Sequence, residues 1–175
     1  GWIRRTADWD WQGAEQAIRR ALSMRPNHPD TLSAAAVFLF NFGQQEEAFR
    51  LGREAARLDP LNVATHIDLS LIFFFSENWI EAERSARRAL ELGPGGSGYH
   101  AILAWSLIQQ QRYEEAKAAL VRDQSEVERL NALGMLAVMQ ADRGAAQQTL
   151  AQLDELARRD PDRADLQQSI AWLCA

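Results

Sequence analysis

Apolar residues recur along most of this chain at intervals of three and four residues, the spacing that places them on one face of an α-helix. Gly43 and the pair Glu77-Asn78 interrupt the pattern, and Pro60 and Pro94 each follow the end of a helical stretch. Because proline lacks a backbone N–H and clashes with the preceding turn, it stops a helix. The pattern therefore predicts units of helix, turn and helix, with helices over 29–42, 45–58, 63–75 and 79–92.

This helical pattern repeats with a fixed 34-residue period. Three series of residues share the period and its phase: Pro26, Pro60 and Pro94; Ala14, Ala48, Ala82 and Ala116; and Ala21, Ala55 and Ala89. Such self-similarity is the signature of a repeat architecture, in which each unit buries its apolar face only against its neighbours. The sequence therefore predicts an array of stacked helical hairpins.

The 34-residue period and its small residues resemble the tetratricopeptide repeat (TPR), and the resemblance covers essentially the whole chain. That family has small residues at the eighth, twentieth and twenty-seventh places of each unit, where helices approach closely. Here those places hold Ala36, Ser70, Ala104 and Gly134; then Ala14, Ala48, Ala82, Ala116 and Ala146; then Ala21, Ala55 and Ala89.

The resemblance implies an all-α TPR solenoid of antiparallel helix pairs in a right-handed superhelix, with about four full repeats and half-repeats at both ends. A single array spans 1–175, with units 1–26 (partial), 27–60, 61–94, 95–124, 125–161 and 162–175 (partial). Because the helical pattern is cut at both ends, we expect a piece of a longer protein. We also expect a second copy of the chain, as in a homodimer, to cover the apolar residues at the ends, which are Trp2, Ile3, Ile170, Trp172 and Leu173.

The unit over 95–124 departs from the pattern. Its twenty-seventh place holds Asp123 instead of a small residue, and the step from Ala116 to Ala146 is shorter than the period. Ser125 and Glu128 have the spacing of a capping box, which opens a new helix. We therefore expect the second helix of this unit to be shortened.

The composition narrows the classes of partner. Apolar residues make up 47% of the chain and charged residues 25%, and the net charge of −5 comes without any basic stripe, so nucleic acid is not an expected partner. The longest apolar runs are too short to cross a membrane, so no membrane insertion by this segment is expected. Cys174 is the only cysteine, which excludes an internal disulfide and a cysteine zinc cluster.

Candidate catalytic and metal-binding residues are few. His66 and His100 are separated by one period and so occupy equivalent places of neighbouring units, but Asp68 is the only acid near His66 on its helix. A metal site needs more ligands than this, so packed histidines on a helix face are favoured. The segment 94–98 follows a helix and lacks the Gly-Lys-Ser/Thr ending of a phosphate loop. The sequence predicts no cofactor, no metal and no enzymatic activity.

The resemblance also implies a groove, because TPR arrays line their concave side with the first helix of each unit. Here the lining is strongly apolar, which favours a protein-binding surface. Its members are Val37, Phe40, Asn41, Ile67, Leu71, Phe74, Phe75, Trp105, Ile108, Met135, Val138 and Met139. The alternative is that these side chains pack among themselves. TPR co-chaperones grip a carboxylate with Lys, Arg and Asn at the fifth, sixth and ninth places of their units. In the three units over 27–124 these places hold none of those residues, but Ser33, Ala34, Val37, Ile67, Asp68, Leu71, Ala101, Ile102 and Trp105.

Two functions remain open on this basis. The first is a protein–protein interaction scaffold that binds a peptide, a helix or a second copy of itself through the groove. The second is a sensor domain that takes a small apolar or aromatic ligand into the same groove. An enclosed pocket around Phe74 and Trp105 would favour the sensor, and an open channel would favour the scaffold.

A narrower resemblance lies in two short segments, Asp8-Trp9-Asp10-Trp11 and Leu58-Asp59-Pro60-Leu61. Both are similar to TPR segments that lie C-terminal to bacterial class III adenylate/guanylate cyclase domains or to winged-helix regulators. This resemblance implies a regulatory module of a larger bacterial signalling protein. It implies a cytoplasmic location, or a periplasmic one if the parent protein is inserted in a membrane.

Overall fold

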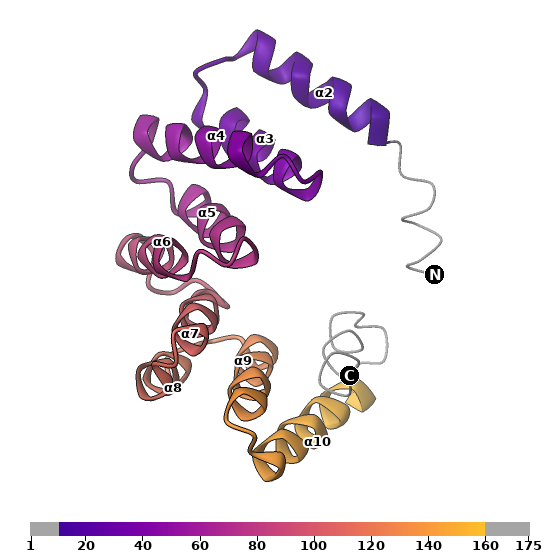
Figure 1. Cartoon of the computed structure of the whole chain (residues 1–175), viewed down its shortest axis with the longest axis vertical. Helices are drawn as coiled ribbons and strands as arrows, with labels where there is room; N and C mark the ends of the chain where they lie inside the picture. Colours follow the sequence, from indigo (N-terminus) through magenta and orange to yellow (C-terminus); the bar gives the residue numbers. More distant parts are fainter. Residues whose placement is uncertain (1–10, 160–175) are drawn as a thin grey trace.

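The computed structural model describes residues 11–159, and these residues form nine α-helices and no β-strand. Figure 1 shows the helices following one another along an arc, with α5, α7 and α9 on its inner side and α6 and α8 on its outer side. The helices are α2 (Trp11–Met24), α3 (Pro29–Asn41), α4 (Gln45–Leu58), α5 (Val63–Phe75), α6 (Trp79–Leu92), α7 (Tyr99–Gln109), α8 (Tyr113–Leu120), α9 (Glu126–Met139) and α10 (Arg143–Arg159). The predicted all-α solenoid of antiparallel helix pairs in a right-handed superhelix is confirmed.

Consecutive helices pair into hairpins: α3 with α4, α5 with α6, α7 with α8, and α9 with α10. Each hairpin turns through one residue in the left-handed region, which is Gly43 (φ 75°) in the first. The N–H of the next residue donates to a carbonyl five residues back, as Gln44 does to Leu39 over 2.9 Å, and this satisfies the end of the first helix. Side chains occupy the left-handed position in the later hairpins, namely Glu77, Gln111 and Ala141.

Small side chains lie where the helices of a hairpin approach most closely. Ala48, Ala82 and Ala116, which recur at the period, are all 0% exposed. Ser70 donates from its hydroxyl to the carbonyl of Ala82 over 2.9 Å, so a short side chain of α5 contacts the backbone of α6 at this point. Because a small residue on one helix lets ridges of the other enter its grooves, the alanine series sets the spacing of the stack.

The unit over 95–124 has the expected short second helix, since α8 is eight residues long whereas α6 has 14. Ser125 caps α9, and its hydroxyl accepts the N–H of Glu128 over 3.2 Å. Asp123 is only 4% exposed. Its carboxylate accepts the N–H groups of Gly98 at 3.1 Å, Ala101 at 2.7 Å and Ser125 at 2.7 Å. This carboxylate therefore joins the start of α7 to the turn between α8 and α9.

Some expectations fall on residues outside 11–159. These are the end residues Trp2, Ile3, Ile170, Trp172 and Leu173, the half-repeat over 162–175, and most of the Asp8–Trp11 segment. Among the helices that are described, none combines the length and the apolar character needed to cross a membrane.

Candidate partner-binding site on the inner face

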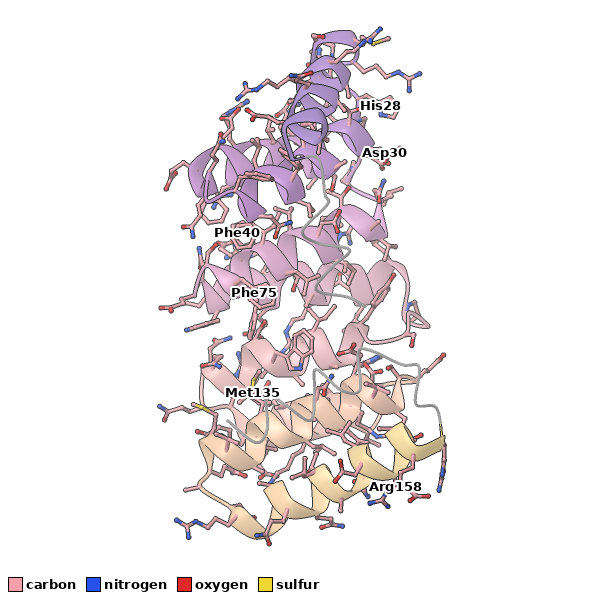
Figure 2. All side chains as sticks on the ribbon, turned by 90° about the vertical axis from the view of Figure 1, so that its right-hand side faces the viewer. His28, Asp30, Phe40, Phe75, Met135 and Arg158 are labelled. Atoms are coloured by element: carbon pink, nitrogen blue, oxygen red, sulfur yellow. The ribbon has the colours of Figure 1, made fainter. Side chains whose placement is uncertain are left out.

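The first helices of the hairpins supply all twelve predicted groove residues, but these residues differ widely in exposure. Phe75 is 63% exposed, Val138 54% and Met139 43%, and Asn41 is also exposed. Six others are half-buried: Val37, Phe40, Ile67, Leu71, Trp105 and Met135. Figure 2 shows Phe40 of α3, Phe75 of α5 and Met135 of α9 following one another down the molecule. We call these ten residues the inner strip.

Phe74 and Ile108 do not belong to the inner strip, and the expectation that they face a partner is wrong. Phe74 is 7% exposed, because its ring packs against Trp79 at 5.2 Å and Trp105 at 5.8 Å between centroids. Ile108 is 0% exposed within the cluster that includes Leu136 of the following hairpin. Both residues lie on the side of their helix that is covered by neighbouring helices, so they stabilise the stack.

Trp105 lies at the border between the inner strip and the core. Its ring packs against the ring of Phe74, with centroids 5.8 Å apart, and Trp105 and Met135 both pack against the core cluster that contains Phe74. The indole Nε1 is buried and has no hydrogen-bond partner among the residues described. A buried N–H without an acceptor is unfavourable, so Trp105 is held in place by its apolar contacts. Substitution of Trp105 would therefore affect packing as well as the surface.

The outer side of the stack is polar in contrast. Glu83 of α6 accepts hydrogen bonds from Arg87 at 2.8 Å, Arg112 at 2.6 Å and Gln110 at 2.9 Å. Burial alone would raise the pKa of the Glu83 carboxyl, but hydrogen bonds from Gln110 and Arg87 and the charges of the arginines hold it below its ordinary value. Most other outer arginines pair with a glutamate three or four residues away on the same helix. Such exposed pairs contribute little to stability.

A half-buried acid lies between two first helices. The hydroxyl of Ser33 on α3 donates to the carboxylate of Asp68 on α5 over 2.9 Å. Burial raises the pKa of the Asp68 carboxyl, and the hydrogen bond from Ser33 opposes this only in part. Because the folded state prefers the neutral acid, ionisation of Asp68 favours unfolding.

We expect Asp68→Asn to change how stability depends on pH. With a folded pKa above the ordinary 3.8, Asp68 contributes stability at low pH that is lost as pH rises through the folded value. Asparagine keeps an acceptor for Ser33 and removes the charge. The stability of the variant relative to the parent chain, measured by urea unfolding, should therefore increase as the pH is raised from about 3.5 to 7. A difference that is independent of pH would contradict this assignment.

His66 and His100 lie in different surroundings. Nε2 of His66 lies 3.2 Å from the carbonyl oxygen of Pro60, so the ring holds the turn before α5. His100 lies on α7 and borders a pocket on the outer side. Within the described part of the chain, no three histidine, cysteine or acidic side chains gather as a metal site would require.

A comparison with solved structures finds several proteins of similar fold. TTC0263, a thermophilic TPR protein of Thermus thermophilus, matches with a TM-score of 0.75 and 18% identity over 98% of this chain and 94% of its own. PilF of Pseudomonas aeruginosa matches with a TM-score of 0.63 and 21% identity over 90% and 72%. YrrB, a TPR protein with an unusual peptide-binding site, matches with a TM-score of 0.59 and 19% identity over 90% and 81%. No family model and no curated protein matches the chain.

The alignments cover most of this chain and of the solved structures. At sequence identities of 18 to 21%, they show a shared fold. Together with the stacked hairpins and the buried alanine series, they establish the architecture. The chain has the tetratricopeptide-repeat fold.

Proposed function

We propose that this chain is a protein–protein interaction scaffold that binds an amphipathic helix or an extended apolar peptide along the inner strip. The observation that carries the proposal is the exposure of Phe75, Val138 and Met139, large apolar side chains on one side of the array. Exposed apolar patches on soluble proteins usually mark interaction sites, and aromatic and methionine side chains adapt well to a partner. The similar fold of YrrB, with its unusual peptide-binding site, supports the same class of ligand.

The packing of the aromatic side chains favours a polypeptide over a small apolar ligand. A sensor would need an enclosed pocket around Phe74 and Trp105. Instead, Phe74 contacts Trp79, Phe75 and Trp105 with ring centroids 5.2 to 5.8 Å apart, so the rings fill the space between the helices. The most exposed ring of this cluster is that of Phe75, which offers a surface and not a cavity. A second copy of the chain could use that surface as well as another protein could.

The wider setting is also part of the proposal. The segments Asp8–Trp11 and Leu58–Leu61 resemble TPR segments attached to cyclase or winged-helix domains. This resemblance supports a role as a regulatory module of a larger bacterial signalling protein. We propose that this module works in the cytoplasm, or in the periplasm if the parent protein is inserted in a membrane. It would hold a partner close to the output domain without catalysing a reaction.

Site-specific crosslinking tests which face binds. A photoreactive phenylalanine analogue would replace Phe75 in one variant and Arg84, an exposed residue of α6, in another. Each variant would be illuminated in a cell extract of the organism that the protein comes from. The adducts would then be mapped by mass spectrometry. We expect the variant at Phe75 to capture one apolar segment repeatedly and the variant at Arg84 to capture none.

A titration with the captured segment then measures the contribution of the ring. Phe75→Ala should weaken binding about tenfold or more, because exposed aromatic anchors dominate such interfaces. Its thermal stability should change little, because the side chain is 63% exposed. Arg84→Ala, the matched control, should bind like the parent chain. If Arg84→Ala loses affinity while Phe75→Ala does not, the partner binds the outer face and the proposal fails.

A further inference from the structure

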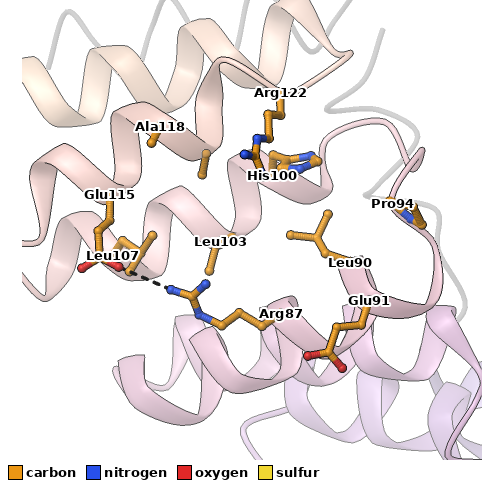
Figure 3. Close-up of a pocket in the computed structure, with 11 residues that line it drawn as sticks. Arg87, Leu90, Glu91, Pro94, His100, Leu103, Leu107, Glu115, Ala118 and Arg122 are labelled. Atoms are coloured by element: carbon orange, nitrogen blue, oxygen red, sulfur yellow. Dashed lines mark ion pairs between the residues drawn. The ribbon is translucent and has the colours of Figure 1, made fainter.

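The short helix α8 leaves a pocket on the outer side of the array, away from the inner strip. Helices α6 and α8 each pack on α7 but not on one another, and α8 ends at Leu120 after eight residues. The pocket between these helices has a volume of about 490 Å³, within the range that ligand sites occupy. Figure 3 shows it between α6 and α8, with α7 behind.

The floor of this outer pocket is apolar and rigid. Leu103 and Leu107 of α7 are 6% and 1% exposed, and Leu90 of α6 packs against the same core cluster. Ala119 at the end of α8 is 9% exposed and completes the lining. These side chains belong to the core of the stack, so the floor does not have to form when a ligand arrives. An apolar group placed on them would be removed from water on one side.

One end of the outer pocket is closed by an ion pair. Arg87 of α6 lies 3.6 Å from Glu115 of α8 and also 2.8 Å from Glu83. The dashed line in Figure 3 marks the first of these contacts, which joins the two helices across the opening. Glu91 on the rim pairs with Arg88 at 3.0 Å. The charges at this end and along this rim are therefore compensated.

The other end carries positive charge without compensation. Arg122 follows α8 and is exposed, and its guanidinium has no ion pair or hydrogen bond among the residues described. Figure 3 shows Arg122 and the ring of His100, which comes from α7, at the same end of the pocket, and both residues line it. A guanidinium presents a planar fork of donors that matches a carboxylate. An imidazole at the same end of the pocket can add another donor.

We propose that the outer pocket binds a carboxylate that is attached to a compact aliphatic or aromatic group. Arg122, assisted by His100, would hold the carboxylate, and the apolar group would lie on Leu90 and Leu103. A free carboxylic acid and the C-terminal residue of a peptide share this chemistry. The site is separate from the inner strip, so it would stand even if the inner strip bound nothing.

Titrations followed by NMR of the isotope-labelled chain test the proposal. The probes are 4-phenylbutanoate and the peptide acetyl-Ala-Ala-Leu with a free carboxylate, and the amide of each serves as its control. We expect both acids to shift amide signals of α6, α7 and α8, and the amides to have no such effect. Tighter binding of the peptide would assign the site to a polypeptide C-terminus, and tighter binding of phenylbutanoate would assign it to a free acid.

Two arginine variants test whether the charge of Arg122 binds the acid. Arg122→Gln should weaken binding of the preferred acid about tenfold, since the pair with the carboxylate is lost. Arg143→Gln, on α10, removes an exposed arginine that likewise lacks an ion pair among the residues described, and it should bind like the parent chain. The proposal is overturned if neither acid binds at millimolar concentration, if the amides bind equally well, or if Arg122→Gln binds like the parent chain.

Discussion

Replacing Asp123 with alanine is expected to lower the free energy of unfolding by about 3 kcal/mol, since hydrogen bonds to a buried charged group are strong and their loss leaves buried donors unpaired. The N–H groups of Gly98 and Ala101 would lose their acceptor, and both residues are buried. Urea unfolding followed by circular dichroism would measure the loss. Hydrogen exchange should show its largest increase at the start of α7, where these two N–H groups lie.

Two further variants make this result specific. Asp123→Asn keeps one acceptor oxygen and should fall between alanine and the parent chain. Asp142 is the matched control, because its carboxylate accepts the N–H of Ala145 over 3.0 Å at the start of α10 but is exposed. Asp142→Ala should lower the free energy of unfolding by about 1 kcal/mol or less. Equal losses for Asp123→Ala and Asp142→Ala would mean that the buried carboxylate has no special role.

Replacing Ala82 with leucine is expected to lower the free energy of unfolding by about 1–3 kcal/mol, because extra carbon atoms in a close-packed contact force the helices apart. Ala82 is 0% exposed, and its carbonyl accepts the hydroxyl of Ser70 at 2.9 Å, so α5 has no room to yield. Ala48→Leu, at the equivalent place of the preceding hairpin, should behave in the same way. Thermal melts of both variants would measure the effect.

The control for this prediction is Ala34→Leu, because Ala34 is exposed on α3. Its stability should stay within about 0.5 kcal/mol of the parent chain, as for most surface substitutions. If Ala82→Leu and Ala48→Leu are as stable as Ala34→Leu, the alanine series does not mark the closest approach of the helices.

The repeat pattern located the helices closely. The predicted 45–58, 63–75 and 79–92 coincide with α4, α5 and α6, and α3 ends at Asn41, one residue before the predicted end. These boundaries could be predicted because the signals are local. A turn residue such as Gly43 and a proline such as Pro60 act on the backbone next to them, whatever lies across the stack.

The candidate site was predictable only in part. The sequence predicts that the neighbouring residues Phe74 and Phe75 of α5 both line the groove, yet Phe74 is 7% exposed and Phe75 is 63% exposed. The difference arises because Trp79 and Trp105, from two other helices, cover Phe74 and leave Phe75 open. Helical spacing identifies the face of a helix, but it does not say how far a neighbouring unit reaches over that face.

The contacts of Asp123 and the lining of the outer pocket also could not be predicted from helical spacing. The sequence marked Asp123 only as a departure from the small-residue series, whereas its partners Gly98 and Ala101 lie far from it along the chain, in the preceding turn and helix. Arg122 and His100, from separate parts of the chain, line one pocket only because α8 packs against α7. Sequence by itself determined the period, the helices and the places of closest approach, since these follow from backbone chemistry and side-chain volume. The tertiary structure decided which side chains are exposed and which polar groups meet, because both depend on how separate helices are placed by the packing of the whole stack.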